Sequence, residues 1–287
     1  MGAMRECGIG AFRRPAASRC AMFLCVVGLI LAAMQVASWA RFAKAAENLA
    51  SPLPVQNSPE LRVGLILPIR LESTLVVRDA QKGQLLEARV MQDVPLTEGS
   101  KLAMKSVVKG TVLGVTNDSD GAGFNLTVSF TQVESRNQTL TMNTSLRAMA
   151  SYQAVRTSQT PLTGPDGGTP AGWANTVQIG GDIRYGDGGL VRNGHKQKVG
   201  KGVFGGVLVH VQANPSAGCE GPIDGDDHLQ ALWVFSADAC GVYGMKGANI
   251  AHAGKSDPIG EITLHFEKND MKLDAGTAML LRVVAHP

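Results

Sequence analysis

Residues 124–150 read FNLTVSFTQVESRNQTLTMNTSLRAMA, and this stretch decides the fold class. Apolar side chains alternate with polar ones over residues 124–130 and again over residues 140–148. A period of two gives each strand one buried and one wet face, as in an antiparallel sheet. The polar residues 134–137 separate the two runs and are typical of a turn. The stretch therefore predicts a hairpin of two long strands.

The same alternation recurs along the chain, whereas no segment after residue 46 has helical periodicity with caps at both ends. The fold class that we expect is all-β, an antiparallel barrel or sandwich, preceded by one N-terminal hydrophobic helix. The other predicted strands cover residues 69–75, 85–92, 107–115, 203–211, 232–235, 262–266 and 278–284.

Glycine-rich sequence interrupts this pattern over residues 160–202, and the chain holds 34 glycines in all. Glycine suits turns with positive φ, so we expect a long irregular insertion with a few short strands. Residues 61–159 then form a β-barrel-like unit. Residues 203–287 either complete the same domain or form a second small one.

The N-terminal 45 residues have the layout of an export signal. Basic residues precede an apolar, uncharged run at residues 21–40, and small residues follow it. A run of this length also just spans a bilayer, so a cleaved signal peptide and an uncleaved anchor both remain open. Residues 46–60 contain Pro52, Pro54 and Pro59 and form an extended linker. In either case we expect an exported protein, periplasmic, cell-surface or secreted, that meets a membrane only through this segment.

The net charge of +3 follows from the leader. Residues 1–45 hold six basic residues and one acid, and removing them from the totals of 27 and 24 leaves 21 basic and 23 acidic residues. A nucleic-acid-binding surface needs clustered positive charge, so nucleic acid is not an expected partner. Partners among envelope or cell-surface proteins fit the export signal better.

Cys219 and Cys240 are the two cysteines that follow the leader. An even count in an oxidising compartment predicts one disulfide between them. The acidic string at Asp224, Asp226 and Asp227 supplies the oxygen ligands that calcium prefers, but it lacks the complete EF-hand pattern. We therefore expect no cofactor, with a calcium site at these residues as the alternative.

Two further functions remain as alternatives. A secreted hydrolase could use Asp224, Asp226 or Asp238 with a histidine, or a triad of Ser236, Asp238 and His252, although no GxSxG motif is present. A carbohydrate- or surface-binding module needs exposed aromatic rings on which a ligand can stack. The candidates are Trp173, Tyr185 and Trp233, of which Trp233 could instead pack in a core with Phe235 and Tyr243.

The succession LPIRLESTL (67–75), KGQLLEARVMQDV (82–94), KSVVKGTVLGV (105–115) and FNLTVSFTQVESRNQTLTM (124–142) resembles the β-barrel domain of TrbI-like proteins. These proteins are channel-core components of conjugation and type IV secretion systems, and a membrane helix and a proline-bearing linker precede their barrel. The resemblance covers residues 67–150, and no apolar helical segment like the family's outer-membrane helix follows. The stretch ALWVFSADACGVYG (231–244) resembles exported bacterial proteins of unknown role.

No coherent catalytic set accompanies the leader and the β-rich body. The sequence therefore predicts an exported, non-catalytic β-domain protein that serves as an envelope-associated structural or protein-interaction module. The resemblance implies a relation to a secretion-system scaffold.

Overall fold

The predicted hairpin is present, but its second strand is split between two partners. Strands β7 (Phe124–Ser135) and β8 (Gln138–Thr141) pair antiparallel, with Ser135 opposite Gln138. Met142 then interrupts the strand, and its backbone N–H still donates to the Thr131 carbonyl at 3.0 Å. Beyond it, β9 (Asn143–Ala150) leaves β7 and pairs with β19 (Ala278–Val284). The prediction of one continuous second strand was wrong, because the strand changes its partner at Met142. Both faces of β9 are buried after this change.

These coordinates are a computed structural model, and they describe residues 61–96, 99–117, 123–136, 138–159, 178–181, 184–185, 189–192, 196–211, 228–268 and 270–285. The predicted N-terminal helix, the leader and the linker 46–60 lie outside the described residues. Residues Ser58–Pro287 cluster as one unit, which includes the strands on both sides of the glycine-rich region.

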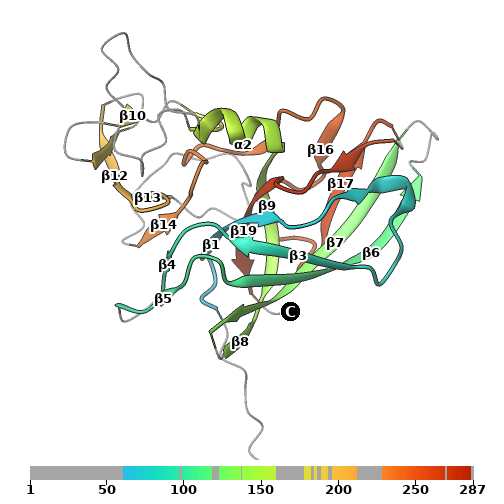
Figure 1. Cartoon of the computed structure of the whole chain (residues 1–287), viewed down its shortest axis with the longest axis horizontal. Helices are drawn as coiled ribbons and strands as arrows, with labels where there is room; N and C mark the ends of the chain where they lie inside the picture. The colour runs from blue at the N-terminus through green and yellow to red at the C-terminus, as the bar shows by residue number, and fades with distance from the viewer. Residues whose placement is uncertain are drawn as a thin grey trace, which may run out of the picture. The chain divides into compact units, whose positions relative to one another are not determined.

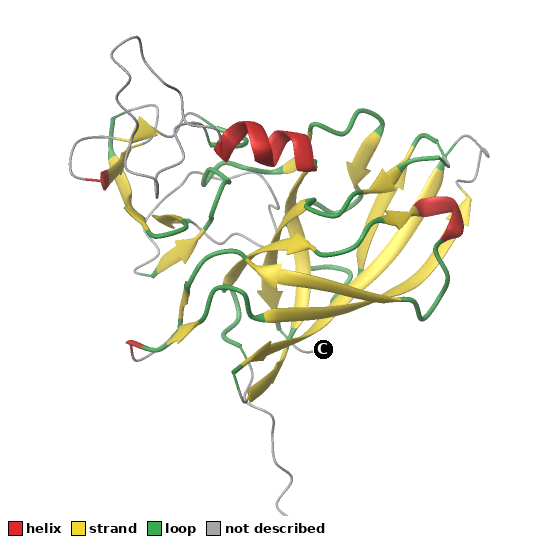
Figure 2. Ribbon diagram, in the orientation of Figure 1, coloured by secondary structure: helices red, strands yellow, loops and turns green. Residues whose placement is uncertain are grey.

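A ten-stranded sheet holds most of the described strands (Figures 1 and 2). Its hydrogen-bonded order is β15-β9-β19-β1-β3-β6-β7-β17-β16, with β8 added to β7. All pairs are antiparallel except β15 with β9, which is parallel. The all-β prediction is confirmed, but the strands do not close into a barrel, since this path ends at β15 and β16. The remaining strands of the sheet are β1 (Ile66–Leu71), β3 (Leu85–Val90), β6 (Val107–Asn117), β15 (Gly241–Tyr243), β16 (Ala248–Ile250) and β17 (Ile262–Phe266).

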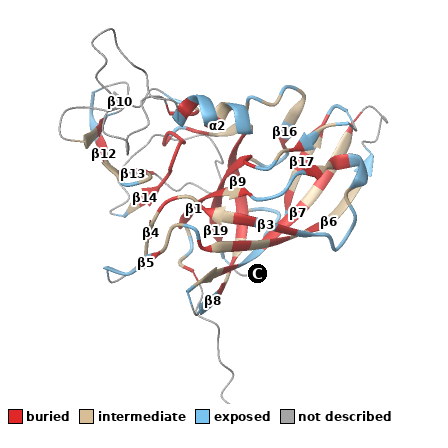
Figure 3. Ribbon diagram, viewed as in Figure 1, coloured by how far each residue is buried: buried red, intermediate tan, exposed pale blue. Residues whose placement is uncertain are grey.

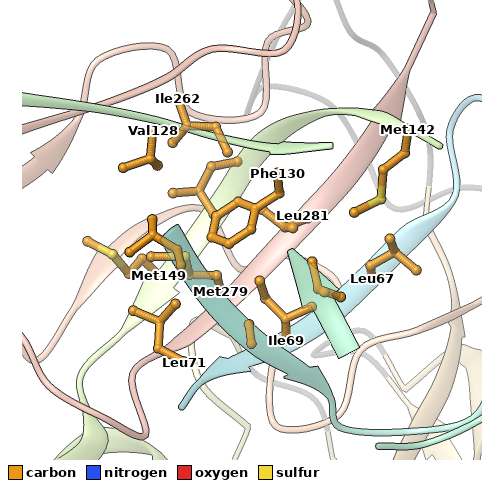
Figure 4. Packing of buried hydrophobic residues seen from close by; sticks show 14 of the residues in the cluster. Leu67, Ile69, Leu71, Val128, Phe130, Met142, Met149, Ile262, Met279 and Leu281 are labelled. Carbon is orange, nitrogen blue, oxygen red and sulfur yellow. The ribbon is translucent and has the colours of Figure 1, made fainter. Parts of the chain in front are cut away.

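One face of this sheet carries the main hydrophobic core (Figure 4). Alternate residues of β1 and β19 reach it, and the Phe130 ring of β7 lies among them with no exposed surface. Gly110 of β6 lies opposite Phe130, and a Cβ atom there would come within 2.6 Å of the ring. Glycine is therefore the residue that lets the two strands pack. The labelled core residues are Leu67, Ile69, Leu71, Val128, Phe130, Met142, Met149, Ile262, Met279 and Leu281.

A five-stranded antiparallel sheet forms the second part of the fold. Its strands are β10 (Arg184–Tyr185), β11 (Leu190–Arg192), β12 (Lys198–Val203), β13 (Gly206–His210) and β14 (Leu229–Ala231), paired in this order. Its buried valines, Val191, Val199, Val207 and Val209, share a second hydrophobic cluster with Ala278 and Leu280 of β19. Both faces of β19 are consequently buried (Figure 3).

Two short pairs complete the strands. β2 (Leu75–Val76) pairs with β18 (Lys272–Leu273), and β4 (Val94–Pro95) pairs with β5 (Lys101–Leu102). A 3-10 turn, η2, covers Val77–Asp79.

Residues 232–235 were predicted as a strand and instead form a turn that ends in an isolated bridge between Phe235 and Ile179. Trp233 has a φ of 50° there, in the left-handed region that no regular strand uses. All four residues of the run are buried. A short apolar run indicates burial, but it does not by itself indicate a strand.

The expectation that no helix follows residue 46 was also wrong. Helix α2 spans Tyr152–Gln159 directly after β9. The Ser151 hydroxyl accepts a hydrogen bond from the Ala154 N–H at 3.1 Å and so satisfies one donor of the first turn. A helix of this length buries only Val155 and Ser158, too few residues to create visible periodicity. Within the described ranges, no helix is long and apolar enough to cross a membrane.

Candidate functional site

Two buried glutamines join the five-stranded sheet to the large sheet. Gln92, which has no exposed surface, donates from Nε2 to the Val207 carbonyl at 2.8 Å and accepts at Oε1 from the Trp233 N–H at 2.7 Å. Gln230 of β14 accepts at Oε1 from the Ile66 N–H of β1 at 3.1 Å. Both amides bond to backbone groups of neighbouring segments, and the Val207 carbonyl also accepts from the Leu232 N–H at 3.2 Å, so the two glutamines act as structural ties.

A buried arginine makes a third tie. Arg147 of β9 donates from Nε to the Ala239 carbonyl at 3.0 Å and from Nη2 to the Ala237 carbonyl at 3.3 Å. Burial lowers the pKa of Arg147, and the nearby Asp238 carboxylate partly opposes this effect. The two hydrogen bonds of the Arg147 guanidinium therefore join the turn after Phe235 to β9 of the large sheet.

The face of the five-stranded sheet that carries Lys201 and His210 is hollowed. The hollow has a volume of about 550 Å³. The pairing of β12 with β11 is irregular at Val199, so that Lys201 lies opposite Leu190 and Lys198 opposite Arg192. This irregularity brings Lys198 and Lys201 to the same face, where both are exposed, while Val199 joins the second cluster. Lys201 pairs with Leu190 of β11, and His210 of β13 pairs with Leu229 of β14. The described residues that line the hollow are Leu190, Lys198, Gly200, Lys201, His210 and Leu229.

The electrostatics of this hollow are one-sided. Lys198 and Lys201 carry positive charge, and none of the described lining residues is acidic. Leu190 and Leu229 add apolar surface between them. Sequence reasoning missed this set, because its members are far apart in the chain and because the two lysines of KVGKGV (198–203) share a face only through the irregular pairing at Val199.

The residues expected to stack on a ligand divide into three cases. Trp233 is 2% exposed, so its ring is not available on the surface. It packs in the second cluster with Phe235, and the half-buried Tyr243 packs against them, which confirms the alternative of an aromatic core. Tyr185 belongs to β10 by its backbone, but its side chain lies outside the described part, as does the whole of Trp173.

The triad candidates do not converge among the described residues. Ser236 is completely buried, and its Oγ accepts from the Asp238 N–H at 3.2 Å. His252 lies exposed in the turn after β16, and it forms no hydrogen bond with Ser236 in the described structure. A hydroxyl buried away from a base is not an activated nucleophile.

The calcium candidates Asp224, Asp226 and Asp227 lie outside the described residues, as does Cys219. Within the part of the chain that the structure describes, no group of three His, Cys, Asp or Glu side chains is placed to hold a metal. Cys240 is half-buried, and its N–H donates to the Tyr243 hydroxyl at 2.9 Å. The disulfide between Cys219 and Cys240 stays a prediction.

The hollow on the five-stranded sheet is thus the candidate site that the described residues define best. Comparison with known proteins adds no name to it: no family model matches the chain, and no curated protein matches it significantly.

Proposed function

We propose that this protein is an exported, non-catalytic β-domain of the cell envelope that binds a partner protein at the hollow on its five-stranded sheet. The hollow lined by Lys198, Lys201 and His210 carries this proposal. Its volume of about 550 Å³ is enough to receive several side chains of a bound segment. Export rests on the leader sequence.

The chemistry of the lining specifies the partner. Basic side chains attract an acidic segment and set its orientation, whereas Leu190 and Leu229 offer apolar contact between the charges. The partner that we expect is therefore an envelope or cell-surface protein whose binding segment alternates acidic and aliphatic residues. The two lysines are exposed to solvent, so salt screens their attraction for an acidic segment. The affinity for the partner therefore falls as ionic strength rises.

The buried polar side chains support a structural role. Three buried side chains form hydrogen bonds with backbone groups of neighbouring segments, namely Gln92, Gln230 and Arg147. Such ties make the sheet that carries the hollow rigid, which favours binding because little ordering is needed when a partner arrives. A scaffold needs this property.

Within the all-β class, the finer architecture that we propose is sandwich-like. The five-stranded sheet shares its hydrophobic cluster with β1 and β19, as two layers of a sandwich do. The resemblance of residues 67–150 to the TrbI-like barrel adds a relation to a secretion-system scaffold. Secretion-system genes beside the gene for this chain would support that relation.

A peptide-binding measurement tests the proposal. The probe is a fluorescent peptide that alternates glutamate and leucine, titrated with the full-length chain and followed by anisotropy. We expect binding that the double variant Lys198→Glu, Lys201→Glu weakens at least tenfold. The matched control, Lys82→Glu with Lys255→Glu, changes the same charge at exposed positions outside the five-stranded sheet and is expected to bind as the parent does.

The partner itself is identified in the envelope of the native cell. A photo-crosslinking residue at position 190 is expected to join an acidic, leucine-bearing segment of another protein. Equal loss of peptide binding in both charge-reversal variants, or binding of a lysine-leucine peptide as tight as that of the glutamate-leucine peptide, would contradict the proposal.

A further inference from the structure

Two arginines lie inside the structure on neighbouring strands. Arg147 of β9 is 8% exposed and Arg282 of β19 is 7% exposed. Leu281 pairs with Leu146 and Leu280 with Ala148, so Arg147 is the extra residue of a β-bulge. A bulge redirects the side chain that it carries. Ser145 lies directly opposite Arg282 in the same pair of strands and shares its face of the sheet.

The hydrogen bonds of this cluster are incomplete. Arg147 uses two of its donors on the Ala237 and Ala239 carbonyls. Arg282 forms no side-chain hydrogen bond or ion pair in the described structure, although a guanidinium has five N–H donors. The Ser145 hydroxyl, which is 4% exposed, also has no hydrogen-bond partner there. The Arg282 nitrogens are not among the wholly buried unpaired atoms of the described residues, and Arg282 lines an open hollow, so its N–H groups can donate to an acceptor from outside.

The charge of the cluster points to an anion. Burial lowers the pKa of Arg282, and the positive charge of Arg147 acts in the same direction. Among the described residues, the carboxylate whose charge acts on Arg147 is that of Asp238, which is exposed. An oxyanion beside both guanidiniums would relieve their mutual repulsion and accept their free N–H groups.

A hollow of about 170 Å³ gives a ligand access to Arg282. Except for Asp257 and Ser256, its other lining residues are apolar, namely Val63, Ile259, Val283, Val284 and Ala285. Val63 is 58% exposed and Ile259 is 37% exposed, so part of this apolar surface faces solvent. An aliphatic group fits the apolar lining, while Arg282 fits an anionic head.

We propose that this hollow binds an aliphatic carboxylate, whose chain packs on Val63 and Ile259 and whose carboxylate accepts hydrogen bonds from Arg282, with Ser145 and Arg147 behind it. The site is separate from the basic hollow of the five-stranded sheet, and the proposal does not depend on it. Asp257 opposes the ligand's charge and keeps the affinity moderate. The carboxylate can come from a free short-chain acid or from the C-terminus of a peptide that ends in an aliphatic residue.

The direct test compares two probes that differ in one group. N-acetyl-leucine has the carboxylate, and N-acetyl-leucinamide has a neutral amide in its place. We expect the acid to bind the full-length chain, held in a non-ionic detergent and followed by ligand-observed NMR, at least tenfold tighter than the amide. Equal binding of the two probes, or no binding of the acid at millimolar concentration, would overturn the proposal.

Variants locate the site. Arg282→Met keeps most of the volume and removes the charge, and it is expected to weaken binding of the acid at least tenfold without lowering Tm. Asp257→Asn should strengthen binding of the acid, because it removes the negative charge in the lining of the hollow. Arg78→Met, at an exposed arginine of the 3-10 turn η2, serves as the matched control and is expected to change neither quantity.

A purely structural arginine behaves in the opposite way. If Arg282→Met lowers Tm while binding of N-acetyl-leucine stays unchanged, Arg282 has an internal partner and the proposal fails. The source of the carboxylate follows from a second comparison on the parent protein. Hexanoate binds tighter than Gly-Gly-Leu if the natural ligand is a free acid, and Gly-Gly-Leu binds tighter, with loss on C-terminal amidation, if it is a peptide C-terminus.

Discussion

The side-chain oxygen of Gln92 accepts a hydrogen bond from the backbone N–H of Trp233, 141 positions later in the chain, at 2.7 Å. The same amide donates to the Val207 carbonyl. One side chain therefore bonds to both the β12–β13 hairpin and the turn at residues 232–235. The residue that donates this hydrogen bond, Trp233, has a left-handed backbone conformation with a φ of 50°. The pair connects the fold of the large sheet to the geometry of the basic hollow.

Replacing Gln92 by Met is expected to destabilise the protein by about 1–3 kcal/mol, because the buried Trp233 N–H loses its partner, whereas the Val207 carbonyl still accepts from the Leu232 N–H. Urea unfolding followed by tryptophan fluorescence measures the change. Gln153→Met, on the exposed side of helix α2, is the control and should stay near the parent. A loss in Gln92→Met no larger than in the control would show that the amide is not a tie.

Replacing Gly110 by Ala is expected to cost roughly 1–3 kcal/mol, the usual range for overpacking a core. The new Cβ would lie 2.5 Å from the Ser129 carbonyl oxygen and 2.6 Å from the Phe130 ring. Gly114→Ala is the matched control, since it lies in the same strand and its Cβ meets nothing within 4 Å. Thermal unfolding of the two variants compares them, and equal Tm values would argue against the packing of β6 on β7.

The Asp93 carboxylate is expected to make stability depend on pH in the acid range. Hydrogen bonds from Lys101 and from the Met104 N–H lower the pKa of Asp93. A folded-state pKa below the unfolded value of about 3.9 stabilises the protein above that pH, and the contribution disappears as the pH falls through the folded pKa.

The parent should therefore be more stable than Asp93→Asn at neutral pH, by less than about 1 kcal/mol because the pair is largely exposed. The difference should shrink below about pH 4. Denaturant unfolding at several pH values measures it, with Asp270→Asn in an exposed turn as the control. A difference that persists unchanged in strong acid would mean that the side chain stabilises without its charge.

Cys219 and Cys240 are expected to be joined in the exported protein. Closing a loop of this length contributes roughly 3 kcal/mol in the chain-entropy model. Alkylation without reductant, followed by mass spectrometry of the mature chain, should label neither thiol, whereas prior reduction should expose both. Labelling of both thiols before reduction would show that the disulfide is absent.

Local pattern carried much of the fold. The alternation over residues 262–266 predicts β17, and the mostly apolar run over residues 278–284 predicts β19, both with the bounds that the structure has. The start of β6 at Val107 follows in the same way. Pairing partners do not follow from such patterns. β9 looks like a continuation of β8, and its transfer to β19 depends on a strand more than 120 residues later in the chain.

The sites show the same division. The sequence predicts an aromatic core at Trp233 and Phe235 from residue type. It also shows an arginine within each of two apolar runs, SLRAMA (145–150) and MLLRVV (279–284), but the role of a buried charge follows only from the side chains around it. Only the tertiary structure places Arg147 beside Arg282, since a bulge and a strand pairing bring them together.

The sequence by itself determined the all-β class and the positions of most long strands, because period-two alternation is a local consequence of burying one face. It also locates the apolar leader, which is a property of composition over a short run. Tertiary structure alone decided that Lys198, Lys201 and His210 line one hollow, that Trp233 turns inward and that two arginines share a face. These relationships depend on long-range backbone contacts, which no short window of sequence contains.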